Sequence, residues 1–557
     1  MTSIAAGRPV GLGRFTVQVS MSLRVIPDKN KGLQRKAWPS PDDYLLSVVI
    51  APRFIIWLTC AFAAGTLSVG AQAPVVNYLQ PAGIWPGEPT TIQFFGDSLQ
   101  GVRHVWTSFK SGVEIPGGDS PNARLIVPGR TPAGIGAIRL ITTNGVSSLR
   151  LMLVDPLPPV VSNGRNHTAA VAQPLIPPVA VDGGCDALTA DFYRLPVRAG
   201  QRLTFEVVAQ RLGSPLDARL RLLDGQGREL AANDDAIGTD PVLTHTFAAA
   251  GDCLVEIRDT RHQGGPNHRY RLRIGEFEAS PLPFHSDAMD TLKRDPAIQE
   301  DEPNDQPAQA QVVTLPSLLQ GRFDRNGDRD LFEFSAKKDQ RVVFSGLTRS
   351  LGSPCDLFLQ IQSTNGSVLA EANVSSADEG SITNTFKQDG RFRLLVEELN
   401  QRGGPGLFYE IAVRPWTPAF KLTVATERIS GPPGSEIEIT VSATRQDFDG
   451  PIQLRAEANA QAIKVTDHVI APKSAETKVK IAVPEELNIG DFLCFSIVGV
   501  ANISGTNVTV RASTMPALRA IWPEMPYPPM SLDGSIALGV SESKSATPAA
   551  AQKKKRN

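Results

Sequence analysis

The sequence has few cysteines, few aromatic residues and no excess of either charge. Its 557 residues include five Cys and 6% aromatic residues, with 56 Lys and Arg against 57 Asp and Glu. After residue 73 the balance is 48 basic to 54 acidic side chains. This composition disfavours a nucleic-acid partner, because such a partner requires a basic face.

Long helices and coiled coils are also excluded. The chain contains 47 Gly and 44 Pro, so a residue that favours turns or breaks helices occurs about every six positions. At roughly 100 to 200 residues per domain, the length predicts three to five domains.

The familiar catalytic motifs are missing after residue 73. There is no H-E-x-x-H, no G-x-S-x-G, no P-loop and no G-x-G-x-x-G between a strand and a helix. The histidines do not show the i, i+4 spacing of metal ligands, and His262 and His268 flank a turn where they are expected to be bystanders. We therefore expect that the protein is not an enzyme.

One segment, Phe54 to Ala71, is apolar enough to be a membrane candidate. It follows Arg53 and ends in Ala71-Gln72-Ala73, which is the pattern of a signal peptide and its cleavage site. We predict that residues 1–73 are a signal peptide with a long N-terminal extension, cleaved after Ala73, so that the mature chain has no membrane span. An uncleaved anchor is the alternative, because the stretch before the apolar core is unusually long.

Four cysteines remain after cleavage, and none are closely spaced. No zinc or redox motif follows from them. Cys185 and Cys253 fall in one expected domain and could form a disulfide in an oxidising compartment. The alternative is that all four are buried thiols acting as small hydrophobic side chains.

The middle of the chain contains an internal repeat. At an offset of 139 residues, 191–274 aligns with 330–413 without a gap, and about a quarter of the 84 positions are identical. The matches include Leu-Gly-Ser-Pro at 212–215 and 351–354, and Gly-Gly-Pro at 264–266 and 403–405. Shared turn residues indicate two copies of one domain.

Apolar residues alternate with polar ones within each copy. Examples are Leu203-Thr-Phe205-Glu-Val207 in the first copy and Phe332-Glu-Phe334 in the second. Period-two alternation with turns every 8 to 15 residues is typical of antiparallel strands. The fold class is therefore predicted to be all-β, built from tandem β-sandwich domains.

The sequence DEPNDQPAQAQVVTLP at 301–316, followed by DRDLFEF at 328–334, resembles the start of a bacterial pre-peptidase C-terminal domain. That family is a jelly-roll-like β-sandwich similar to the collagen-binding domains of bacterial collagenases. Residues 75–155 resemble an IPT/TIG immunoglobulin-like domain, and 419–512 resemble a bacterial immunoglobulin-like domain. The expected organisation is 1–73 signal peptide, 74–157 IPT/TIG-like, 158–278 first copy, 279–298 linker, 299–416 second copy, 417–515 immunoglobulin-like, and 516–557 Pro-rich segment with a basic disordered tail.

Carboxylate and amide side chains gather in two segments of the second copy, 300–305 and 324–330. Calcium requires six to eight oxygen ligands, which two such segments can supply. Resemblance to the collagen-binding relatives implies structural calcium bound by Glu300, Glu302, Asn304, Asp305, Asp328 and Asp330. A solvated acidic linker is the alternative. The first copy lacks the paired glutamates and keeps only Asp191, so we predict no calcium there.

The resemblances imply an exported binding or adhesion protein of the bacterial envelope or exterior. Its partner would be an extracellular protein or polysaccharide, with calcium stabilising the start of the second copy. Two alternatives remain open: a structural spacer of the envelope, or an accessory component of a secreted peptidase.

Overall fold

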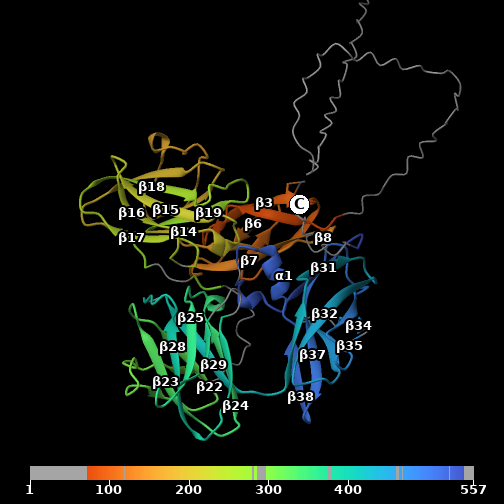
Figure 1. The fold of residues 1–557 in the computed structure, drawn as a ribbon. Coiled ribbons are helices and arrows are strands. Elements are labelled where there is room, and N and C mark those ends of the chain that lie inside the picture. Colours follow the sequence, from red (N-terminus) through yellow and green to blue (C-terminus); the bar gives the residue numbers. More distant parts are fainter. Residues whose placement is uncertain are drawn as a thin grey trace, which may run out of the picture. The chain divides into compact units, whose positions relative to one another are not determined.

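The computed structural model describes residues 72–544, except 118–119, 237, 279–281, 285–296, 374–378, 405, 459–462, 467 and 526. The predicted signal-peptide core and the basic tail lie outside the described residues. Strands dominate, and the described part contains one α-helix, α1 (Met515–Ile521) (Figure 1). The all-β prediction is confirmed. Within the described range, no helix has the length and apolarity needed to cross a membrane.

The first sandwich consists of two sheets with strand orders β1-β3-β6-β5 and β2-β9-β7-β4, with β8 paired to β7. Its core includes Ile92, Leu125 and Leu140, none of which is exposed. The strands are β1 (Val75–Gln80), β2 (Gly83–Ile84), β3 (Thr90–Asp97), β4 (Val102–Thr107), β5 (Gly112–Glu114), β6 (Asn122–Ile126), β7 (Gly134–Thr142), β8 (Gly145–Val146) and β9 (Arg150–Val154).

The second sandwich pairs two five-stranded sheets, β10-β12-β19-β14-β17 and β11-β13-β18-β15-β16. The strands are β10 (Pro159–Val161), β11 (Gln173–Pro174), β12 (Val179–Gly184), β13 (Asp191–Val197), β14 (Arg202–Val208), β15 (Ala218–Asp224), β16 (Glu229–Asn233), β17 (Val242–Thr246), β18 (Gly251–Asp259) and β19 (Arg269–Gly275).

Cys185 and Cys253 lie in the core of the second sandwich as free thiols. The two thiols are therefore not joined in a disulfide. Burial raises the pKa of Cys253 to about 12, which disfavours a reactive thiolate.

The third sandwich has the same strand order as the second: β20-β22-β29-β24-β27 and β21-β23-β28-β25-β26. Its strands are β20 (Ala297–Gln299), β21 (Gln311–Val312), β22 (Ser317–Arg322), β23 (Arg329–Ala336), β24 (Arg341–Leu347), β25 (Leu357–Ser363), β26 (Val368–Asn373), β27 (Ser381–Thr385), β28 (Gly390–Glu398) and β29 (Phe408–Pro415). β20 begins before residue 299, so the third sandwich takes in the last residues of the expected linker.

The repeated Leu-Gly-Ser-Pro motif forms the same turn in both sandwiches. A short 3-10 helix, η2 (Gln210–Leu212) or η4 (Arg349–Leu351), ends at a glycine with φ of 76° at Gly213 or 90° at Gly352. Only glycine adopts this left-handed conformation without strain. The turn residues are therefore shared because the backbone requires them.

The fourth sandwich has sheets ordered β30-β32-β36-β34 and β31-β39-β37-β33-β35, with β38 paired to β37. Along β36 the outward Lys478 and Lys480 alternate with the fully buried Val479 and Ile481, as period two requires. The strands are β30 (Ala419–Val424), β31 (Arg428–Gly431), β32 (Glu436–Gln446), β33 (Ile452–Ala458), β34 (Val465–Thr466), β35 (Val469–Ile470), β36 (Glu476–Ala482), β37 (Phe492–Ile503), β38 (Thr506–Arg511) and β39 (Ile536–Val540).

The expectation that the chain leaves the fold after residue 515 is wrong. β39 lies between β31 and β37, parallel to the former and antiparallel to the latter. Ile536, Leu538 and Val540 are buried in the core of the fourth sandwich. Between β38 and β39, α1 and the following Trp522 pack into an apolar cluster with side chains of the first sandwich. The predicted tail thus contains core residues as far as 540.

Buried ion pairs join the first and second sandwiches, which belong to one compact unit with the rest of the described chain. Arg271 of β19 is not exposed, and its Nε donates to Asp155, which follows β9, at 2.8 Å. Its Nη1 donates to Asp182 of β12 at 2.5 Å. A Cβ atom at Gly83 would collide with this guanidinium. Arg273 Nε lies 3.4 Å from the same Asp155, and the backbone N–H of Ala82 donates to Asp182 at 2.9 Å, so several buried polar contacts fasten the two sandwiches together.

We predict that Leu538→Ala lowers the free energy of unfolding by about 2–5 kcal/mol, because it leaves a cavity in the core of the fourth sandwich. The matched control is Met530→Ala, which shortens a side chain that is 47% exposed in the same expected tail. Urea denaturation of the chain from residue 74 measures both. Equal midpoints for the two variants would contradict the position of β39.

Candidate metal centre

The predicted calcium residues lie where the chain crosses between the two sheets of the third sandwich. Residues 300–305 follow β20, which pairs in parallel with β22, and precede β21, which pairs in parallel with β23. The backbone N–H of Glu300 donates to Gln320 at 2.9 Å, and that of Leu331 donates to Asn304 at 3.2 Å. Both ends of the acidic segment are therefore held against β22 and β23, the two strands that flank the loop containing residues 324–328.

Asp330 and Tyr409 form the centre of the cluster. Asp330 on β23 is fully buried, and its Oδ2 accepts a hydrogen bond of 2.6 Å from the Tyr409 hydroxyl on β29. The same hydroxyl lies 3.1 Å from Oε2 of Glu300. A phenol has one proton to donate, so it cannot satisfy both carboxylates at once. A Cβ atom at Gly321 would collide with Oε2 of Glu300 and with the Tyr409 hydroxyl, which explains the glycine at that position.

The carboxylates of this cluster resist ionisation in the absence of a cation. Burial, followed by the charges of Glu300, Asp328 and Glu302, raises the pKa of Asp330 to about 9. Burial and the charge of Glu302 raise the pKa of Glu300. Burial, with Asp328 and Asp305 nearby, raises the pKa of Glu302. Like charges held this close favour either protons or a bound cation.

Several buried polar atoms of the cluster lack a hydrogen-bond partner. Both side-chain amide atoms of Asn304 are unpartnered although the residue is fully buried. Oδ1 of Asp330 and Oδ1 of Asp328 are unpartnered as well, with Arg325 Nε 3.6 Å from the latter. Leaving such groups unsatisfied costs about 1–3 kcal/mol each. Buried oxygens without donors, contributed by three residues, are suited to a hard cation.

The second sandwich provides an internal comparison. Asp191 and Tyr270 occupy the positions of Asp330 and Tyr409, with the same hydrogen bond of 2.6 Å. The other oxygen, Oδ1 of Asp191, lies 3.2 Å from Nδ1 of His167. Asn166 takes the position of Asn304, but it donates to Phe192 at 3.1 Å and lies 3.2 Å from the Ser162 hydroxyl. The second sandwich therefore satisfies the amide of Asn166 and places His167 beside Asp191, although Oδ1 of Asp191, like that of Asp330, makes no hydrogen bond.

The structure brings together five of the six predicted residues. Asp305 lies to one side, where it accepts a 2.6 Å hydrogen bond from Arg325. Among the described residues, no three His, Cys, Asp or Glu side chains stand in a geometry that could already hold a metal ion. The sequence analysis missed Tyr409, which matches Tyr270 in the repeat and could have been found there.

The chain is similar to several proteins in part. No family model matches it. A probable subtilase-type serine protease of Deinococcus radiodurans is 28% identical over 212 residues, which are 34% of this chain and 29% of the protease. The chain thus spans less than a third of that relative, so the relative's activity does not transfer to it.

Two solved structures resemble the chain, both at low TM-scores. The pre-peptidase C-terminal domain of a Bacillus anthracis collagenase is matched over its whole length and 21% of this chain, with 14% identity and a TM-score of 0.17. A four-domain fragment of the ICAM-5 ectodomain is matched over 96% of its length and 78% of this chain, with 13% identity and a TM-score of 0.13.

Unfolding in a chelator should depend on pH through Asp330. The folded chain holds this proton up to about pH 9, whereas an unfolded aspartate releases it near pH 4. The free energy of unfolding therefore falls as pH rises between these values. We predict that Asp330→Asn weakens this dependence and raises the melting temperature at pH 8 by about 5 °C.

The exposed Asp339, also in the third sandwich, provides the matched control Asp339→Asn. It should follow the wild-type melting curve from pH 5 to 9 in calorimetry. A wild-type slope retained in Asp330→Asn would contradict the burial of an unpaired carboxyl at position 330.

Proposed function

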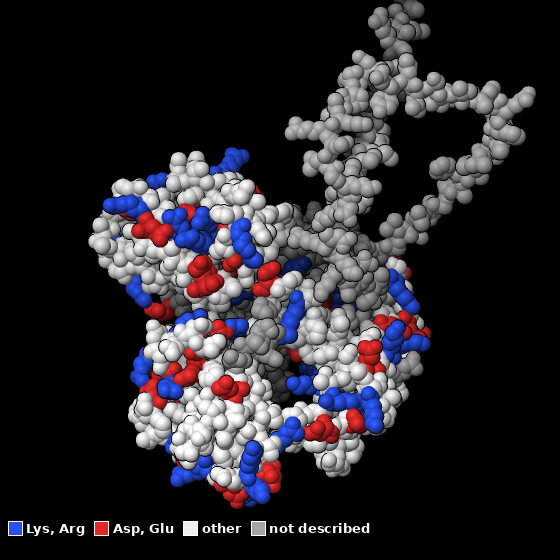
Figure 2. All heavy atoms as spheres, viewed as in Figure 1, with Lys and Arg blue, Asp and Glu red and all other residues white. Residues whose placement is uncertain are grey.

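We propose that this chain is an exported, non-catalytic binding protein that adheres to an extracellular protein or polysaccharide. One observation carries the proposal: the described chain is a series of β-sandwiches, two of which share one topology. Lys and Arg are interspersed with Asp and Glu on the face shown in Figure 2, as suits a protein with no nucleic-acid partner. In this proposal the second and third sandwiches are pre-peptidase C-terminal-like, flanked by IPT/TIG-like and immunoglobulin-like modules.

An accessory role beside a secreted peptidase is the second candidate. It is favoured by the partial similarity to a subtilase-type protease. In this case the sandwiches would position a separate catalytic chain instead of attaching to a matrix. The buried Arg271 bridge, which fastens two sandwiches together, also suits a spacer that must keep its geometry.

We further propose that the third sandwich binds one structural calcium ion. Glu300, Glu302, Asn304, Asp328 and Asp330 would provide its oxygen ligands, and Asp305 would stay paired with Arg325. The ion would neutralise the repelling carboxylates and fix residues 300–305 against β23. In the second sandwich, His167 beside Asp191 takes that place, so no calcium is expected there.

Calcium titration of the chain from residue 74 tests this proposal. We predict one equivalent of bound calcium by calorimetry, and a melting temperature that rises with calcium concentration, because the ion binds only the folded state. Glu302→Gln and Asp330→Asn should each weaken binding by at least about tenfold, since each removes one charged ligand.

Asp191→Asn is the control, because it makes the same change at the equivalent position of the second sandwich. It should leave both stoichiometry and affinity as in the wild type. Two bound equivalents of calcium, or a loss of binding in Asp191→Asn, would contradict a calcium site confined to the third sandwich.

The adhesion proposal is tested by sedimentation of the same chain with insoluble collagen, cellulose, chitin and bacterial cell wall, in calcium and in chelator. We expect retention on at least one matrix, reduced in chelator and in Asp330→Asn. Retention that is the same in calcium and in chelator would show that adhesion does not depend on the metal centre. Absence from every pellet would reject adhesion and favour the accessory role.

A further inference from the structure

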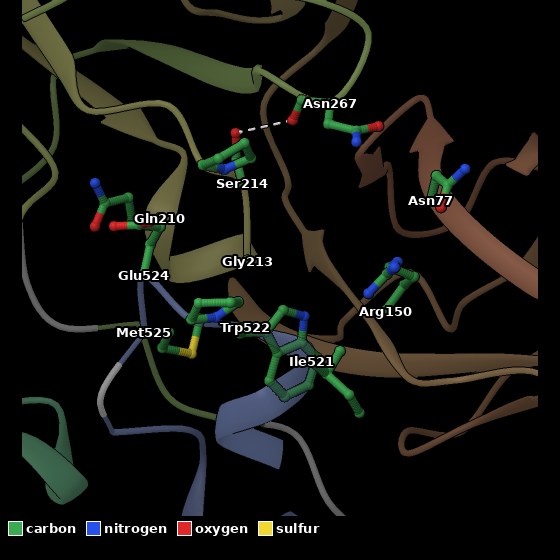
Figure 3. A pocket seen from close by; sticks show the side chains of 12 residues that line it. Asn77, Arg150, Gln210, Gly213, Ser214, Asn267, Ile521, Trp522, Glu524 and Met525 are labelled. Carbon is green, nitrogen blue, oxygen red and sulfur yellow. Dashed lines mark hydrogen bonds between the residues drawn. The ribbon is translucent and has the colours of Figure 1, made fainter. Parts of the chain in front are cut away.

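A small pocket lies where the first sandwich, the second sandwich and the segment after α1 meet. Its volume is about 190 Å³. Figure 3 shows Arg150 and Asn77 of the first sandwich on one side and Ser214 of the second on another, with Trp522 along the base. It is separate from the carboxylate cluster of the third sandwich, whose residues do not line it.

Trp522 provides a flat apolar wall with an unused donor. The side chain is 2% exposed, and its indole edge packs against Gly213, where a Cβ atom would collide with the ring. Its Nε1 has no hydrogen-bond partner. A buried indole N–H normally finds an acceptor, because an unpaired buried donor is costly.

Arg150 brings a positive charge that its neighbours do not neutralise. Burial, together with the charge of Arg428, lowers the pKa of Arg150 to about 10. The carboxylate of Glu427 is paired with Arg139 at 2.5 Å and lies 3.6 Å from Arg428. Arg150 donates through Nη1 to the Leu149 carbonyl at 3.2 Å, and its Nε has no partner. Glu427, whose charge raises the pKa of Arg150, thus already lies close to two other arginines.

The polar part of the remaining lining includes one acid, which is poorly placed to neutralise Arg150. Asn77 and Asn267 provide amide groups, and Glu524 is exposed to solvent, where its charge is screened. The Gln210 amide oxygen accepts a 2.6 Å hydrogen bond from Thr239. The lining therefore combines one cation, several amides and one aromatic face with the apolar side chains of Pro215, Ile521, Pro523 and Met525.

We propose that this pocket binds a small carboxylate, the size of one amino acid or one acidic monosaccharide. A guanidinium recognises a carboxylate through paired hydrogen bonds. The indole ring supplies an apolar face for the aliphatic or pyranose part of the ligand. The volume is below the range of drug-sized pockets, which restricts the ligand to a single such unit. This binding is independent of calcium and of the adhesion proposed above.

The test uses the chain from residue 74 and four probes: D-glucuronate and its neutral counterpart D-glucose, and N-acetylglycine and its neutral counterpart N-acetylglycinamide. Saturation-transfer NMR and calorimetry should detect one carboxylate probe and neither neutral one. Binding of glucuronate would identify an acidic sugar as the source, and binding of N-acetylglycine a peptide C-terminus. Arg150→Gln should weaken binding by at least about tenfold, because it removes the charge-assisted pair.

Arg165→Gln provides the matched control, because that arginine is exposed and outside the pocket lining. It should bind as the wild type does. If Arg150→Gln does not fold, Asn77→Phe provides a second test, since it places a bulky ring at an exposed position on the rim. Wild-type binding in either folded variant overturns the proposal, as does equal binding of the neutral probes or binding of no probe.

Discussion

A hydrogen bond between a buried tyrosine and a buried aspartate crosses the interior of both repeated sandwiches. In each case the aspartate belongs to one sheet and the tyrosine to the other: Asp191 with Tyr270, and Asp330 with Tyr409. The bond fixes the two sheets against each other at the end where the chain crosses between them. It also leaves the second carboxylate oxygen in need of a partner, because that oxygen is buried as well. The second sandwich places a histidine beside that oxygen, whereas the third surrounds it with further carboxylates, and the proposed calcium site follows from that difference.

Much of this architecture could be predicted from the sequence, because its determinants are local. Alternation along segments such as Leu203 to Val207 predicts strands, and the shared Gly and Pro predict turns at equivalent positions. The carboxylates at 300–305 and 324–330 are close enough in sequence to suggest one cluster. The hydrogen bond at the centre of the cluster could not be predicted. Tyr409 looks like an ordinary strand residue in the sequence, because its partner Asp330 lies on another strand.

The errors came from interactions between distant parts of the chain. β39 pairs with β31, more than a hundred residues earlier, and parallel pairing leaves no turn signature in the sequence. The run Ile536 to Val540 is short and follows a Pro-rich stretch, so it resembles a tail. Arg271 likewise appears as one more polar residue of an alternating strand, and its partner Asp155 lies 116 positions away. Pairing at such a distance cannot be inferred from spacing.

The position of β39 has a consequence for the order in which the protein matures. The fourth sandwich begins at β30, but its inner strand β39 comes after α1 in the chain and ends at Val540. A chain that is synthesised from its N-terminus can complete the first three sandwiches while this strand has not yet emerged. The fourth cannot close until nearly the whole described chain has emerged. Its open sheet, in which β31 and β37 still lack the strand that pairs between them, is therefore the surface that a chaperone would meet last.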